Sequence, residues 1–394
     1  MIANPENSRE GDPIVIVQLD KVQKQIKKAA TDFVKGEFSD DNLVLENRYP
    51  ELIWKKSSKL GFPGIALPEQ VEGEGFGYTE KVIVAEELCR GDASIGACLT
   101  NAGYGAEILL QNGTEEQKAK WLPKVAAAEI LSALAVSELG SDKIAAIQTT
   151  AVEDKGEWVI CGDKTFVRNA GSLAGMYMVL CRTDADASAP EQAFSIILVE
   201  ADRPGIHLTD VGGRLGLRQD AVADIRFDKV RVPLENLIGK KNQGFSHMAE
   251  FYPKAGLMAA AQALGIARGA FDRSFGYVQQ REQFRKKIIE FQITRHKLAD
   301  LSTAIEASRL LTYQAAWAVD NAQPQARICA MAKLHATQTA LSVTDEAIQL
   351  LGGYGYIEES GVARFFREAR VLDVLDGARN ILKDVIMETI SGKG

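Results

Sequence analysis

Strand-like runs occur in one central stretch of the chain, with helix-like sequence on either side of it. The clearest runs are rich in β-branched and aromatic residues: Trp158–Cys161, Met176–Cys181, Phe194–Val199 and Ile225–Pro233. Turn residues, among them Asp184 and the pair Pro204-Gly205, separate these runs, and helical sequence does not intervene. A parallel sheet of alternating strands and helices is therefore disfavoured.

The flanking segments carry the hydrophobic spacing of helices. Apolar residues recur every three or four positions in Lys21–Ile26 and Tyr78–Leu88. After about residue 243, four long amphipathic segments follow one another, the last of them near 379–391. We therefore predict an α+β fold with three parts. An N-terminal α-helical domain spans 1–129, a small antiparallel β domain 130–240, and a C-terminal four-helix bundle 241–394.

Composition excludes several classes of function. A net charge of −7 and the absence of a dense basic stripe argue against nucleic-acid binding. No apolar run reaches the length of a membrane span, about 18 residues, and the polar N-terminus does not resemble a signal peptide. We expect a cytoplasmic protein. Five scattered cysteines and four dispersed histidines indicate neither a disulfide framework nor a metal site.

Five motifs occur in an order that is itself informative. They are Glu86-Glu87-Leu88 with Asp92-Ala93-Ser94, Val136–Asp142, Phe166–Asn169, Arg281–Phe284 with Phe291-Gln292, and Gln349–Tyr356. In this order, and over roughly 350 residues, the chain resembles acyl-CoA dehydrogenases. The resemblance implies an FAD enzyme that acts on an acyl-CoA thioester. A glycine-rich NAD-binding fingerprint after a strand is not present.

The resemblance also assigns roles to particular residues. Those expected around the flavin ring are Leu134, Val136, Ser137, Phe166 and Arg168, and Ser141 would touch the CoA arm. Arg281 would face the FAD diphosphate of a neighbouring subunit, because a guanidinium fork suits phosphate oxygens. Those expected to complete that site are Phe284, Gln292, Gln349 and Gly353. A homotetramer and an electron-transfer flavoprotein as partner follow from the same resemblance.

The catalytic base is where the chain departs from the family. Its members usually carry a glutamate just before the last helix, and here that position is Asp376, one methylene shorter. The resemblance implies that this carboxylate removes the α-proton while a hydride passes from the β-carbon to flavin N5. A turn-stabilising role for Asp376 stays open. The second base position known in the family falls in Tyr252–Leu257, which has no carboxylate.

Two further residues leave the reaction open. Arg168 replaces a threonine that normally bonds the flavin, and its side chain either points inward to a flavin or acidic substrate group or outward to solvent. Asp92 is a second candidate carboxylate. We predict dehydrogenation of an acyl-CoA with a cyclic or branched acyl group. The alternatives are a flavoprotein with changed chemistry (a lyase, an oxygen-using enzyme, or ring 1,4-dehydrogenation through Asp92) and a non-catalytic partner subunit.

Overall fold

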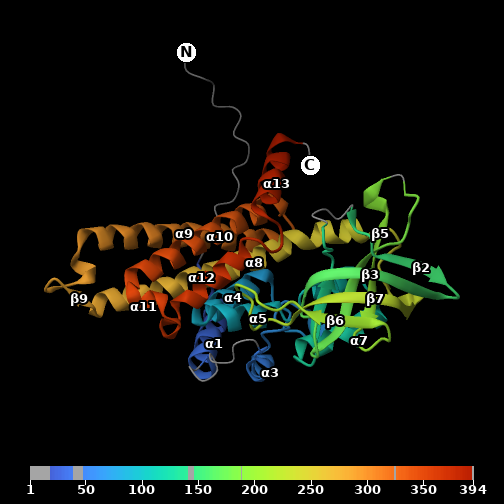
Figure 1. Ribbon diagram of the computed structural model, residues 1–394, viewed down its shortest axis with the longest axis horizontal. Coiled ribbons are helices and arrows are strands. Elements are labelled where there is room, and N and C mark those ends of the chain that lie inside the picture. Colours follow the sequence, from blue (N-terminus) through green and yellow to red (C-terminus); the bar gives the residue numbers. More distant parts are fainter. Residues whose placement is uncertain (1–17, 39–47, 141–145, 188, 324, 393–394) are drawn as a thin grey trace, which may run out of the picture.

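The computed structural model describes residues 18–38, 48–140, 146–187, 189–323 and 325–392. Figure 1 shows the β-rich part at one end of an elongated molecule, while the C-terminal helices run to the opposite end, where the β9 hairpin lies. No helix in these ranges is both long and apolar enough to cross a membrane. The predicted limits at residues 129 and 240 are kept as proposed boundaries of the three parts.

The N-terminal part is made of helices, and several of these begin at local capping signals. The helices are α1 (Lys21–Glu37), α3 (Glu51–Ser57), α4 (Tyr78–Gly91), α5 (Ala93–Asn101), α6 (Ala106–Asn112) and α7 (Glu115–Ala126). At α7, the Gln117 amide donates to Thr114 Oγ1 at 3.2 Å and the Thr114 amide donates to Gln117 Oε1 at 3.0 Å, which closes a capping box. Helix α4 is buried along most of its length and packs against α8.

Among its described residues, the middle part forms one twisted sheet of eight strands. They are β1 (Leu131–Ala135), β2 (Thr150–Asp154), β3 (Glu157–Arg168), β4 (Ala174–Arg182), β5 (Phe194–Glu200), β6 (Ile206–Asp210), β7 (Val222–Pro233) and β8 (Leu237–Ile238). The order is β6-β7-β3-β2-β4-β5-β8, with β1 beside β4. The sheet is mixed rather than wholly antiparallel, because β1 pairs with β4 in parallel. Parallel neighbours need a long connection, and the segment 136–173 provides it.

The C-terminal part is helical, as predicted. Its elements are α8 (Gly244–Gln280), the short β9 (Glu282–Gln283) and β10 (Lys286–Lys287), α9 (Gln292–Asp320), α10 (Ala326–Leu351), α11 (Gly353–Tyr356), α12 (Val362–Leu372) and α13 (Arg379–Ser391). Helices α8, α9 and α10 pack on one another and enclose an apolar core. Within α13, which the structure describes completely, Leu382 alone is buried. Helix α12 packs on α8 and α10, a position that the sequence pattern did not predict.

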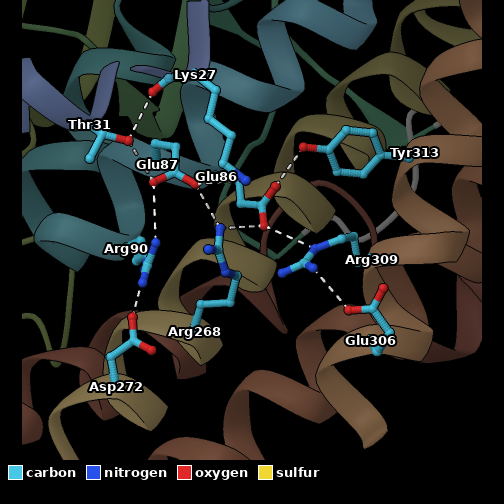
Figure 2. A network of polar contacts seen from close by, with 10 residues as sticks. All are labelled: Lys27, Thr31, Glu86, Glu87, Arg90, Arg268, Asp272, Glu306, Arg309 and Tyr313. Atoms are coloured by element: carbon cyan, nitrogen blue, oxygen red, sulfur yellow. Dashed lines mark hydrogen bonds and ion pairs between the residues drawn. The ribbon is translucent and has the colours of Figure 1, made fainter. Parts of the chain in front are cut away.

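A charged network joins the N-terminal helices to the bundle (Figure 2). Arg268 of α8 donates to Glu86 at 2.6 Å and to Glu87 at 2.8 Å. The Tyr313 hydroxyl donates to Glu86 at 2.6 Å from α9. Burial alone would raise the pKa of Glu87, but the charges of Arg268 and its other basic neighbours outweigh that effect and hold the pKa below its ordinary value. This network fixes α4 against α8 and α9, and so positions the walls of the site described next.

Candidate active site

Asp376 lies in the tight turn between α12 and α13. Its φ of +56° is in the left-handed region, and Gly377 follows with a φ of +108°. Aspartate and asparagine tolerate this region better than most residues with a Cβ. The side chain of Asp376 lines a narrow cavity bounded by α4, α6 and α8. The turn therefore presents a carboxylate to an enclosed space.

The turn that carries Asp376 is held by a lysine from α10. Lys333 is completely buried. Its ammonium donates to the Gly377 carbonyl at 2.7 Å and also to the Leu375 carbonyl. Burial lowers the pKa of Lys333 to about 8, against the opposing charges of Asp376 and Asp373. One cation thus bonds the main chain on both sides of Asp376.

Tyr104 and Arg168 complete the surroundings of the carboxylate. The Tyr104 hydroxyl donates to Asp376 Oδ1, and burial together with the Asp376 charge raises the pKa of Tyr104 well above its ordinary value. The Arg168 guanidinium lies 5.3 Å from the Tyr104 ring centroid and 3.4 Å from Asp220 Oδ2. Burial opposes its charged form, yet Asp376 and Asp220 outweigh it and raise the pKa of Arg168. Arg168 therefore points inward.

Asp92 has a different setting. It is the N-cap of α5, where its Oδ1 accepts from the amides of Ser94 at 3.0 Å and Ile95 at 2.8 Å. Its Oδ2 accepts from Arg364 at 3.1 Å. Asp92 is buried and is not among the residues that line the cavity of Asp376. The two bonds from main-chain amides are those of a helix cap, and Arg364 neutralises the charge.

The residues expected around the flavin ring gather at one edge of the β part. Leu134 is buried in β1, while Val136 is half-buried and Ser137 exposed just beyond that strand. The Ser137 carbonyl accepts from the Thr165 amide at 2.8 Å, which places this segment beside the end of β3. Phe166 has a φ of +56° and is 42% exposed. Ser141 lies outside the described residues.

The residues expected around the FAD diphosphate gather at the far end of the bundle. Arg281, Gln349 and Gly353 line one groove between the end of α8 and the helices α9, α10 and α11. Phe284 projects from the β9–β10 hairpin and is 87% exposed, and Gln292 begins α9. One chain does not bring this group to the flavin-ring group, because the two lie at opposite ends of the molecule (Figure 1).

Both surfaces suit the halves of FAD. At the β part, the exposed Phe166 lies two residues before Arg168 in β3, and the buried Nη2 of Arg168 has no hydrogen-bond partner in the described chain. At the bundle end, a Cβ built on Gly352 or Gly353 would meet open space, so a phosphate can approach the main chain there. Arg281 is exposed beside them.

The sequence did not single out Tyr104 or Lys333, which bond Asp376 and its turn. A signal did exist for Lys333, because it continues the buried face of α10 formed by Cys329, Ala332 and Ala336. A lysine at such a core-facing position is unusual unless it is paired. Tyr104 carries no comparable signal.

The chain is similar to known proteins over nearly its whole length. Family descriptions of the N-terminal, middle and C-terminal domains of acyl-CoA dehydrogenases match residues 20–129, 133–230 and 242–391. The mitochondrial short-chain specific acyl-CoA dehydrogenase of Bos taurus is 32% identical over 375 residues, which cover 94% of this chain and 90% of that protein.

Two further proteins are similar over nearly the whole chain. The CarC subunit of a caffeyl-CoA reductase–Etf complex from Acetobacterium woodii is 33% identical over 92% of this chain and 96% of its own length. The structure of butyryl-CoA dehydrogenase from Megasphaera elsdenii aligns with a TM-score of 0.91 and 29% identity, covering 96% of this chain and 100% of that one. These matches confirm the predicted family and three-part fold. The chain belongs to the acyl-CoA dehydrogenase family, the FAD-dependent oxidoreductases that act on CH–CH bonds of acyl-CoA thioesters.

Proposed function

We propose that the chain dehydrogenates a compact acyl-CoA at its α,β-carbons and that Asp376 is the base. The supporting observation is the state of the two carboxylates that line the cavity, Asp376 and Glu107. Glu107 is paired with Lys81 at 2.5 Å. Asp376 accepts from a neutral phenol and has no ion pair in the described chain. It is therefore the carboxylate available to accept a proton.

The geometry assigns a task to each oxygen of that carboxylate. Tyr104 occupies Oδ1, which leaves Oδ2 to take the α-proton. As that proton leaves, the electron pair of the α-carbon forms the new C=C bond while a hydride departs from the β-carbon. FAD, when bound, supplies the acceptor for this hydride. Lys333 positions the base by bonding the carbonyls of the turn, and Arg168 places a buried positive charge near the developing negative charge.

The substrate and partners follow from the site and the relatives. A cavity of about 110 Å³ favours a compact acyl group, whether branched, cyclic or short and unbranched, over a long chain. An electron-transfer flavoprotein is proposed as the oxidant of the reduced enzyme, since the similar CarC protein is a subunit of an Etf complex. The separation of the two FAD-binding groups supports a homotetramer in which each FAD contacts two chains.

The test is stopped-flow reduction of the bound flavin by one acyl-CoA substrate in two matched variants. Asp376→Asn keeps a residue that tolerates the left-handed turn but removes the proton acceptor. We expect its reduction rate to fall by ~10²–10⁴-fold, with FAD content unchanged. Asp92→Asn keeps a good N-cap and should react within a few-fold of wild type. The reverse pattern would transfer the role of base to Asp92.

Asp376→Glu refines this test. The turn disfavours glutamate, and the longer side chain moves the carboxylate by about one bond length, a displacement that can cost on the order of a hundredfold. We expect this variant to be slower than wild type. A flavin that no acyl-CoA in a broad panel bleaches under anaerobic conditions would refute dehydrogenation and favour a non-catalytic subunit or changed chemistry.

A further inference from the structure

The cavity that contains Asp376 also holds a second set of charged side chains. Much of its wall is apolar, with Phe62, Ile65, Leu99, Phe251 and Met258 among the lining residues. Three charged residues other than Asp376 line it, and they come from three helices: Lys81 of α4, Glu107 of α6 and Lys254 of α8. A purely hydrocarbon acyl group gains nothing from such groups, since charges must be desolvated to meet it.

Two of these three charges neutralise each other. Lys81 Nζ lies 2.5 Å from Glu107 Oε1, and both side chains are largely buried. Burial alone would raise the pKa of Glu107, but the Lys81 charge outweighs it, so that the pKa stays below its ordinary value. Glu107 is therefore an anion that already has its cation.

Lys254 is the third of these charged residues. It is 8% exposed, and within the described chain it has neither a hydrogen bond nor an ion pair. Burial lowers its pKa, opposed by the charges of Glu107 and Glu250. Glu250 precedes it by one helical turn on α8 but is exposed and forms no ion pair with it in the described chain. The cavity thus has a net positive charge at this position.

An unpaired ammonium in a mostly apolar cavity is costly unless a ligand brings the partner. We propose that Lys254 binds an anionic group, most simply a carboxylate, at the distal end of the acyl chain, so that the substrate is the CoA thioester of a short dicarboxylic acid. The proposal rests on the proposed function, because it places the thioester end of the same ligand at Asp376. Asp376 interacts with Tyr104, Arg168 and Lys333. Lys254 interacts instead with the charges of Lys81 and Glu107. The cavity therefore has two separate polar groups of residues.

Calorimetric binding to the FAD-loaded enzyme tests this. Succinyl-, glutaryl- and adipyl-CoA are each compared with the thioester in which an isopropyl group replaces the carboxylate, 5-methylhexanoyl-CoA being the partner of glutaryl-CoA. We expect at least one diacid thioester to bind wild type more tightly than its isostere. In Lys254→Met that thioester should lose about 10- to 100-fold in affinity, the value of a buried charge-assisted hydrogen bond, while the isostere binds no worse.

Two variants serve as controls. Lys240→Met removes an exposed lysine ahead of α8 and should leave the preference for the diacid thioester unchanged. Lys254→Arg keeps the positive charge and should also keep this preference. The inference is overturned if no diacid thioester is preferred, or if Lys254→Met leaves the preference unchanged. Flavin bleaching by the same panel reports separately on dehydrogenation. A preference for diacid thioesters without bleaching would support the role of Lys254 in binding and contradict the proposed reaction.

Discussion

Lys333 places a charge where there is no water to solvate it. Its pKa of about 8 in the folded protein lies below the unfolded value of about 10.4. Between these values the unfolded chain binds more protons, so this group makes the folded state more stable as the pH rises. At neutral pH the buried charge of Lys333, which holds the turn of Asp376, therefore lowers the stability of the folded protein. Such a loss of stability is typical of functional sites.

The prediction concerns wild type against Lys333→Met. From pH 7 to pH 10 the urea midpoint of wild type should rise relative to that of the variant. The corresponding gain in the free energy of unfolding is up to about 3 kcal/mol. Flavin reduction by substrate should also slow in Lys333→Met, because the carbonyls of Leu375 and Gly377 lose their donor. A pH-independent difference between the two midpoints would show that Lys333 does not titrate in this range. The exposed Lys240→Met should show no pH-dependent difference.

At the scale of single residues, the sequence predicted which residue is the candidate base but not which residues contact it. The identity of Asp376 as a candidate base followed from its place in the chain. Its partners did not, because Tyr104 is 272 residues away and Lys333 bonds carbonyls 42 and 44 residues away. No local pattern encodes such contacts. The direction of Arg168 was open for the same reason, since Asp220 and Tyr104 reach it only through the tertiary fold.

At the scale of elements, the junction of α4 with α8 and α9 depends on buried charges rather than on apolar packing alone (Figure 2). Glu86 and Glu87 are 1% and 3% exposed. Removing one partner of a buried ion pair typically costs about 3–5 kcal/mol, because the other charge stays buried and unpaired.

Arg268→Met should therefore lower thermal stability strongly. We expect a loss within this range of about 3–5 kcal/mol, followed by far-UV circular dichroism on heating. The matched control is Arg226→Met, whose partner Asp163 is 66% exposed, and an exposed pair of that kind contributes about 0–1 kcal/mol. Equal shifts in the two variants would mean that the network adds no more than a surface pair.

Sequence patterns predicted where helices and strands lie in the chain better than they predicted which of these elements pack together. The four helical segments expected after about residue 243, the last of them near 379–391, correspond to α8, α9, α10 and α13, because hydrophobic spacing acts locally. The parallel pairing of β1 with β4 and the packing of α12 on α8 depend on segments far apart in the chain. Periodicity within a segment says nothing about which partner it meets.

At the scale of the whole molecule, the two groups of residues proposed to bind FAD lie at opposite ends, so the proposed site needs two chains. Arg281→Ala should reduce both FAD content and tetramer content, because the proposed diphosphate contact crosses a subunit boundary. The ratio of flavin to protein absorbance and sedimentation velocity measure the two. Arg285→Ala, a neighbouring exposed arginine of the same hairpin, should leave both unchanged. A colourless or monomeric Arg285→Ala protein, or an unaffected Arg281→Ala protein, would contradict the assignment.

The network in Figure 2 can be completed only late in the synthesis of the chain. Glu86 on α4 and its cation Arg268 on α8 are separated by 182 residues, with the whole β part between them. A ribosome that adds 5–20 residues per second needs roughly 10–35 s to make that length. Until then Glu86 lacks its partners Arg268, Arg309 and Tyr313, whereas Glu87 can already pair with Lys27 and Arg90. Helix α4 is made early, but it reaches its final packing only after α8 and α9 have been made.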